Sequence, residues 1–289
     1  MPRLGLGTAH QVRLGYPILS EADTVGTSSA YRMMTPSQDN AMTAGKLILV
    51  AKLKGGSGAT TTCRELAAAA LHDERKVALI DLDGQGGLSR WWNRRTAPAA
   101  EGEAPRRAPE LLQLTAAQIP AAANGLRQRY DVVIIDSPPS VHETIRAVAA
   151  ACDLALIPAR PTVDDLDAVG PIARLLHGVV DHGFVLTQVP AVRGSRDGAE
   201  ALQRLAERAP VLGRTTFRSD YSRPPGYGAT GFEEGPAAKQ EIGELYAHVA
   251  ERLSMTCPHD KIGASSHDDV SIASHDDGRT SRRPSVRKS

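Results

Sequence analysis

Residues 54–61 have the sequence KGGSGATT, a glycine-rich segment between a short apolar run and a segment with helical spacing. The apolar run, residues 47–51, is typical of a strand that is buried on both faces, and residues 60–72 are predicted to form a helix. Glycines at a strand-to-helix junction let backbone N–H groups approach phosphate oxygens, and the positive end of the helix dipole faces the same place. The pattern predicts a phosphate-binding loop, although a plain glycine-rich turn has the same local composition.

Apolar runs and helical segments alternate along the rest of the chain. Further strands are predicted at residues 77–80, 111–114, 132–135, 154–157 and 183–189. Further helices are predicted at residues 116–129, 142–151, 163–176, 198–208 and 237–253. Thr162 is expected to cap the helix 163–176. This alternation predicts an α/β fold with a mostly parallel sheet and helices on both faces.

Acidic residues stand at the ends of two predicted strands. Asp81 and Asp83 follow the strand 77–80, and Asp136 follows the strand 132–135. Ligands of parallel sheets bind at the carboxyl ends of the strands, so the acids and the glycine-rich loop are expected to meet in one crevice. Carboxylates beside phosphates require a cation between them, and Mg²⁺ fits these oxygen ligands. The alternative for Asp81 and Asp83 is a pair of ordinary turn acids.

Three segments in this order resemble the ParA/MinD family of deviant Walker A P-loop ATPases. They are KGGSGATTT from residue 54, DLDGQGG from residue 81 and YDVVIIDSPPS from residue 130. The resemblance covers roughly residues 46–254 and is greatest to the small plasmid-partition ParA proteins. It implies a P-loop NTPase fold, the cofactors ATP and Mg²⁺, and a homodimer that forms on nucleotide binding.

The resemblance also implies roles for individual residues. Lys54 matches the signature lysine, which reaches the phosphates of the partner in the dimer. Asp83 matches the acid that positions the attacking water, with Asp81 beside it, and Asp136 matches the Walker B acid, which binds magnesium through a water. The magnesium ligand is the hydroxyl of Thr60. The nucleotide-binding residues are Lys54, Gly55, Gly56, Ser57, Gly58, Ala59, Thr60 and Thr61.

The loop departs from the family pattern at Ala59, where the family has a second lysine. That lysine contacts the β- and γ-phosphates. Its loss is expected to weaken nucleotide binding by roughly 1.5–3 kcal/mol and to lower the hydrolysis rate by about 10²–10³. Nucleotide binding is still expected, with hydrolysis weak or absent. The exchange fits either a nucleotide-gated switch or a residue replaced to trap one state.

Composition excludes several other classes of protein. Lys and Arg number 34 and Asp and Glu 33, so the formal net charge is +1 and the chain as a whole is not a basic nucleic-acid binder. Cys63, Cys152 and Cys257 lack the spacing of zinc or iron–sulfur ligands. Sparse cysteines and no apolar stretch of membrane-spanning length predict a cytoplasmic protein, and the resemblance implies association with the nucleoid.

Basic residues concentrate between positions 193 and 223. This segment contains seven arginines and four acidic residues. The arginines are Arg193, Arg196, Arg204, Arg208, Arg214, Arg218 and Arg223. Family members bind DNA without sequence preference, and scattered arginines suit phosphate contacts. The alternative is an ordinary solvated surface.

The chain is predicted to have three parts: a disordered extension (1–45), the nucleotide-binding domain (46–256) and a polar disordered tail (257–289). The leading hypothesis is a DNA-partition protein that segregates a plasmid or chromosome with a centromere-binding partner, ParB-like or a small adaptor. The alternative is a catalytically inactive regulatory or scaffold module. A MinD-like membrane switch is less favoured, because residues 261–289 lack an amphipathic helix.

Overall fold

The computed structural model describes residues 44–255 except 53, 100–103, 140–142 and 192–195. The predicted extension lies outside these residues apart from Ala44 and Gly45, and the predicted tail lies wholly outside them. Gly45 belongs to the folded domain, because its N–H donates to the Arg127 carbonyl over 3.0 Å. A Cβ at Gly45 would lie 1.8 Å from the carbonyl oxygen of Tyr130, so only glycine fits there.

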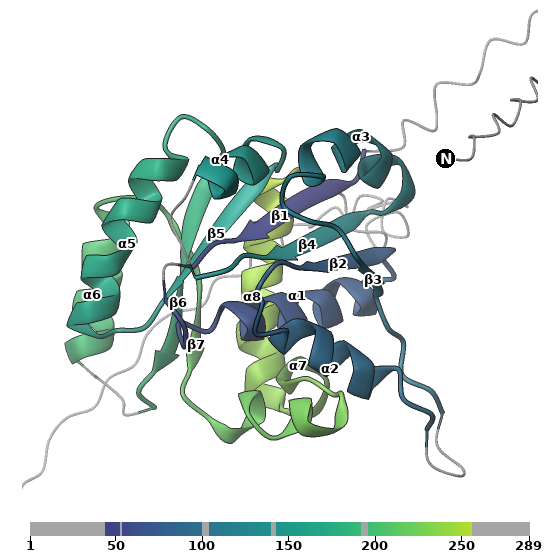
Figure 1. The fold of residues 1–289 in the computed structure, drawn as a ribbon. Coiled ribbons are helices and arrows are strands. Elements are labelled where there is room, and N and C mark those ends of the chain that lie inside the picture. The colour runs from purple at the N-terminus through teal and green to yellow at the C-terminus, as the bar shows by residue number, and fades with distance from the viewer. Residues whose placement is uncertain (1–43, 53, 100–103, 140–142, 192–195, 256–289) are drawn as a thin grey trace, which may run out of the picture. The chain divides into compact units, whose positions relative to one another are not determined.

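Seven parallel strands form one sheet in the order β3-β2-β4-β1-β5-β6-β7 (Figure 1). The strands are β1 (Lys46–Val50), β2 (Val77–Asp81), β3 (Glu110–Leu112), β4 (Val132–Asp136), β5 (Leu154–Ala159), β6 (His182–Val189) and β7 (Val211–Thr216). The predicted parallel α/β fold is confirmed. The strand order places β1, which leads into the glycine-rich loop, between β4 and β5.

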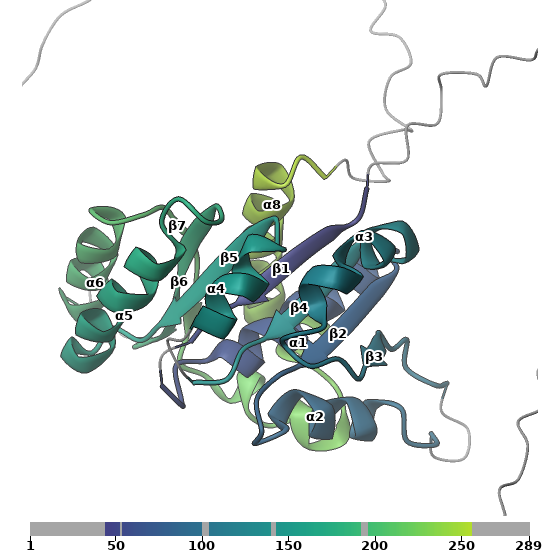
Figure 2. The same cartoon turned by 45° about the horizontal axis from the view of Figure 1, so that its top comes forward.

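Helices cover both faces of the sheet (Figures 1 and 2). One face carries α3 (Ile119–Arg129), α4 (Glu143–Ala150), α5 (Val163–Leu176) and α6 (Arg196–Ala206). The other carries α1 (Ala59–His72), α2 (Gly87–Arg95), α7 (Gly231–Glu234) and α8 (Pro236–Arg252). Two short 3₁₀ turns, η1 (Ser219–Tyr221) and η2 (Pro224–Tyr227), follow β7. No helix in the described part of the chain has the length and apolar content needed to cross a membrane.

Successive residues of β1 alternate between the two cores. Leu47 and Leu49 pack with the α3–α6 face, whereas Ile48 and Val50 pack with the α1 face. The same alternation in β4 places Ile134 on the α1 face. The side chains at positions 52 and 136, two residues beyond Val50 and Ile134, therefore project toward α1, where the glycine-rich loop ends.

Among the α-helices and strands of the described residues, local patterning did not predict α2, β7 and α7. Helix α2 has a polar sequence, but its Trp91 is fully buried and donates its indole N–H to the Ala229 carbonyl over 3.0 Å. Helix α7 has only four residues and depends on a capping box between Thr230 and Glu233. Strand β7 follows β6 at the edge of the sheet. Helix α2 depends on a distant contact, β7 on pairing with β6, and α7 on a local cap, so none of the three follows from hydrophobic periodicity.

Candidate functional site

The glycine-rich loop runs from the end of β1 to the start of α1 with two residues in the left-handed region. Gly56 has φ +83° and Gly58 has φ +91°, and a Cβ at Gly58 would lie 3.1 Å from Thr187. The end of β6 supports the loop, because Thr187 Oγ1 donates to the Ser57 carbonyl over 2.7 Å and Gln188 Nε2 donates to the Gly56 carbonyl over 3.1 Å. The loop therefore has the backbone of a phosphate cradle at a helix N-terminus.

Two other loop residues differ in their surroundings. Gly55 is exposed, and a Cβ there would meet nothing within 4 Å. The Ser57 hydroxyl is buried and has no hydrogen-bond partner within the described ranges. A buried, unpartnered hydroxyl inside the loop is a donor available to a ligand.

Thr60 and Asp136, the two residues expected to hold magnesium, lie in direct contact. The Thr60 hydroxyl donates to Asp136 Oδ2 over 2.6 Å, and Asp136 is fully buried. Burial raises the pKa of Asp136 above its ordinary value, although Lys52 and Thr60 partly offset this effect. A hydroxyl and a carboxylate are oxygen donors that fit Mg²⁺. A magnesium ion bound here would neutralise charge on a phosphate chain.

Lys52 lies between Asp83 and Asp136. Sequence reasoning did not identify it as a site residue. Its ammonium is 2.8 Å from Asp83 Oδ2 and 2.9 Å from Asp136 Oδ1, and the Lys52 side chain is only 5% exposed. Burial alone would lower the Lys52 pKa, but the two carboxylates outweigh burial and raise it. Desolvation would raise the pKa of Asp83, but the hydrogen bonds from Lys52 and from the Gln85 N–H, together with the charges of Lys52 and Arg90, outweigh it and lower the pKa. The raised pKa of Lys52 and the lowered pKa of Asp83 both favour the charged forms of this pair.

A signal for Lys52 was present in the sequence. Lys52 follows Val50 by two residues, so strand alternation directs it to the α1 side of the sheet. Its backbone N–H donates to the Ser137 hydroxyl over 3.1 Å, which ties the chain after β1 to the end of β4. A lysine two residues beyond a buried strand could have been included among the candidates.

Asp81 lies at the same edge of the sheet as Asp136, but its side chain contacts α2 rather than α1. The two acids are paired in the register of β2 and β4. Asp81 Oδ2 accepts the backbone N–H and the hydroxyl of Ser89, both over 2.8 Å, and Asp81 Oδ1 accepts the Asp83 N–H over 3.1 Å. Asp81 therefore orients the first turn of α2 and the turn that carries Asp83.

Lys54 is in an ion pair with Asp165, at the start of α5. Asp165 is 2% exposed and also accepts bonds from Arg160, at 2.8 Å from Nε and 3.1 Å from Nη2. Although burial would raise the pKa of Asp165, the hydrogen bonds from Arg160 and Lys54 lower it to about 2. Thr162 caps α5 as predicted, since its side chain accepts the Asp165 N–H.

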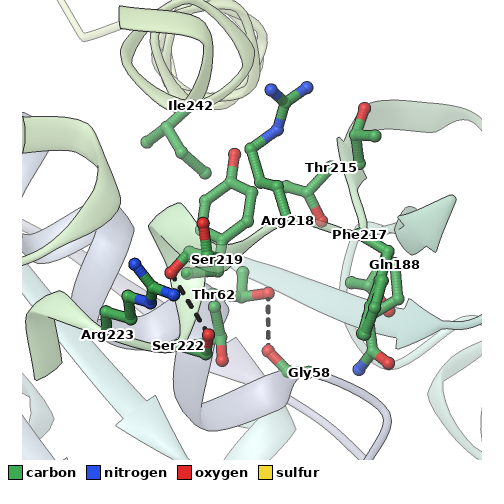
Figure 3. A pocket seen from close by; sticks show the side chains of 14 residues that line it. Gly58, Thr62, Gln188, Thr215, Phe217, Arg218, Ser219, Ser222, Arg223 and Ile242 are labelled. Carbon is green, nitrogen blue, oxygen red and sulfur yellow. Dashed lines mark hydrogen bonds between the residues drawn. The ribbon is translucent and has the colours of Figure 1, made fainter. Parts of the chain in front are cut away.

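Ala59 is the first residue of α1 and is 3% exposed, with its methyl group in the core of the α1 face. Thr61 and Thr62 line a cavity of about 490 Å³ beside the loop. Figure 3 shows Gly58 and Thr62 on one side of this cavity and residues after β7, among them Arg218, on another. Gly58, a residue of the glycine-rich loop, also lines this cavity.

The arginine-rich segment is divided among several places. Arg204 pairs with Asp167 over 3.2 Å, and Arg208 donates to the Leu166 carbonyl over 2.9 Å, so α6 and the turn after it are both joined to α5. Arg218 pairs with Glu241 of α8 over 2.7 Å. The exposed members are Arg196, Arg208, Arg214 and Arg223, and Arg193 lies outside the described residues. Much of the predicted cluster therefore contacts the protein itself.

An all-parallel sheet with a glycine cradle between β1 and α1, and acids at the neighbouring strand ends, defines a P-loop nucleotide-binding protein. The CobQ/CobB/MinD/ParA nucleotide-binding domain family matches residues 48–230, and the chain belongs to this family of ParA/MinD P-loop ATPases. The predicted family resemblance is confirmed.

Two relatives are named for carboxysome distribution and for chromosome partitioning. Maintenance of carboxysome distribution protein A of Gloeobacter kilaueensis is 33% identical over 168 residues, which are 56% of this chain and 72% of that protein. Chromosome partitioning protein ParA of Myxococcus xanthus is 30% identical over 148 residues, 40% of this chain and 52% of that protein. The ATP complex of a Cyanothece McdA variant superposes with a TM-score of 0.60 at 18% identity, covering 74% of this chain and 98% of that chain. The structural likeness concerns the fold.

Proposed function

We propose that this chain is a partition-type positioning protein that binds ATP and Mg²⁺, dimerises on the nucleotide and associates with DNA without sequence preference. The observation that carries this proposal is the pairing of a left-handed glycine cradle with the Thr60–Asp136 contact of 2.6 Å. The cradle provides backbone N–H groups for phosphates, and the contact provides oxygen ligands for the metal. Both are present although Ala59 replaces the second loop lysine.

The cavity beside the loop is suited to the nucleoside. Its volume of about 490 Å³ is within the range of small-molecule sites. Phe217 is 70% exposed at its wall and offers a ring face for stacking against a base. A nucleotide with its phosphates at Gly58 would therefore place its base toward Phe217.

The DNA-binding part of the proposal rests on exposed arginines. Arg196 on α6 and Arg214 on β7 are exposed, and neighbouring arginines that bind α5 or α8 are excluded from this role. Dimerisation would double the number of these cations on one particle. Phosphate contacts of this type make affinity fall steeply with salt. A cargo-linked partner, ParB-like or a small adaptor, would then act on the DNA-bound dimer.

Calorimetry with ATP and magnesium tests the nucleotide part, and gel shifts with and without ATP at two salt concentrations test the DNA part. We expect ATP binding, and DNA binding that increases with ATP. Replacing Arg214 by Ala should reduce the salt slope by about one phosphate contact. Replacing Arg146, an exposed arginine on α4, should not. DNA binding of equal affinity with and without ATP would contradict the proposed coupling between nucleotide binding and DNA binding.

A second candidate is a regulatory or scaffold module that binds nucleotide without turnover. The buried methyl group of Ala59 favours it, because no lysine extends from the start of α1 toward the cradle. Single-turnover measurements separate the two candidates. Release of phosphate from bound ATP supports the ATPase, whereas stably bound ATP supports the module.

A further inference from the structure

The ammonium of Lys52 lies where β1, β4 and α1 meet. One oxygen of Asp136 is 2.9 Å from Lys52 Nζ, and the other accepts the Thr60 hydroxyl over 2.6 Å. Thr60 directly follows Ala59 at the start of α1. A single carboxylate therefore joins the Lys52 ammonium to the helix turn where the family pattern places its second lysine.

We propose that Lys52 is the phosphate-binding lysine of this chain, and that it supplies from the end of β1 the positive charge that Ala59 does not supply from α1. This inference rests on the proposed nucleotide site and assigns its missing cation. Lys52 would then act on the phosphates from the strand end rather than from the helix.

The hydrogen-bonding capacity of Lys52 supports this assignment. An ammonium group has three N–H donors, and within the described residues Asp83 and Asp136 accept from it at 2.8 and 2.9 Å. A third donor therefore stays available for a phosphate oxygen. Since Lys52 is 4% exposed, a bond from it to phosphate would form away from bulk water, where charge-assisted bonds are strong.

The charges around Lys52 also support its assignment as the phosphate-binding lysine. Asp83 and Asp136 are both within ion-pair distance of Lys52, and without this lysine two carboxylates would face an incoming phosphate chain. Like charges in a poorly solvated site repel strongly. Lys52 reduces this repulsion before any nucleotide arrives, and magnesium then adds to the neutralisation instead of providing all of it.

A lysine relocation series tests the proposal. ATP affinity is measured by calorimetry, with magnesium and with EDTA, for the unmodified chain, Lys52→Asn, and the double variant Lys52→Asn/Ala59→Lys. Lys46→Asn, at the opposite end of β1, is the matched control. We expect Lys52→Asn to weaken ATP binding by roughly 10- to 100-fold, the range for one charge-assisted hydrogen bond. The double variant should regain most of this loss, and the control should bind as the unmodified chain does.

Melting temperatures separate loss of binding from loss of folding, and Lys52→Gln provides an uncharged side chain of similar length if Lys52→Asn does not fold. ATP binding by the uncharged variants that equals or exceeds that of the unmodified chain would overturn the proposal. Lys52 would then be a structural ion pair that competes with magnesium. A folded double variant that regains nothing would also overturn it. An unmodified chain that does not bind ATP would overturn the proposed function itself, which is a different result.

Discussion

Lys54 and Asp165 form an ion pair within one subunit, so the lysine at the start of the loop is bound to α5 in this structure. Arg160 binds the same carboxylate through its guanidinium group and its backbone N–H. If Lys54 is to reach the phosphates of a second subunit, its bond to Asp165 has to break. In the proposed dimer this ion pair would oppose association, and nucleotide binding would have to offset that cost.

Replacing Asp165 by Asn should favour the ATP-bound dimer, because Lys54 loses its partner within the subunit. We expect the dimer to form at a protein concentration lower by about tenfold, the effect of one charge-assisted bond. Sedimentation with ATP measures this shift. Asp164→Asn, an exposed neighbour on the same helix turn, is the control. A dimerisation constant that is the same in both variants would contradict the prediction.

Replacing Gly58 by Ala should impair the loop, whereas replacing Gly55 by Ala should not. Gly58 has φ +91° and a Cβ added there would lie 3.1 Å from Thr187, whereas Gly55 has open space around it. A left-handed alanine costs about 1–2 kcal/mol. We expect Gly58→Ala to lower the free energy of unfolding by at least this amount and to weaken ATP binding. Urea unfolding and ATP calorimetry on the two variants check the contrast, and equal behaviour would show that the loop does not require this conformation.

Replacing Ala59 by Lys should increase ATP hydrolysis. Lys52 shares its charge with two carboxylates, so a lysine at position 59 would add unshared charge where the γ-phosphate departs. We expect turnover to rise by about 10²-fold, the usual effect of one such donor. Ala59→Gln, similar in length but neutral, is the control. Turnover by the unmodified chain at the rate of the lysine variant would contradict this prediction and would mean that the shared charge of Lys52 is already sufficient for hydrolysis.

Glu65 of α1 should make stability fall as pH rises toward neutrality. It is fully buried, and its oxygens accept the N–H groups of Gly231 and Phe232 at 3.0 and 2.8 Å. Burial raises the pKa of Glu65 to about 7, and the negative charge of Glu233 acts in the same direction. The two backbone hydrogen bonds and the charge of Arg64 lower the pKa and only partly offset this rise. The folded state therefore retains a proton that the unfolded state releases between the ordinary pKa of 4.5 and about 7.

Because the folded state holds this proton more tightly, the free energy of unfolding decreases as pH rises. The stability contributed by protonated Glu65 is complete below about pH 4.5 and is lost as pH rises through about 7, by about 3 kcal/mol in total. Glu65→Gln removes the titration, so its stability relative to the unmodified chain should improve between about pH 5 and about pH 8. Urea unfolding at these two pH values measures the difference. A difference that does not change with pH would contradict the raised pKa.

Local sequence was sufficient for the parallel sheet, for the loop at residues 54–61 and for the convergence of Thr60 with Asp136. Buried parallel strands are continuous apolar runs, and their ends lie at one edge of the sheet whatever the details of packing. The glycines at 56 and 58 have the left-handed backbone that a cradle requires. These features depend on residues close together in the chain or on the direction of the strands.

Tertiary structure alone decided which cation meets which acid. Lys52 and Asp136 are separated by 84 positions, and their contact depends on the register of β1 against β4. The same holds for Asp81, which binds Ser89 of a helix that local patterning did not predict. Side-chain partners across elements follow from strand register and helix packing, and neither is encoded in the periodicity of a single segment.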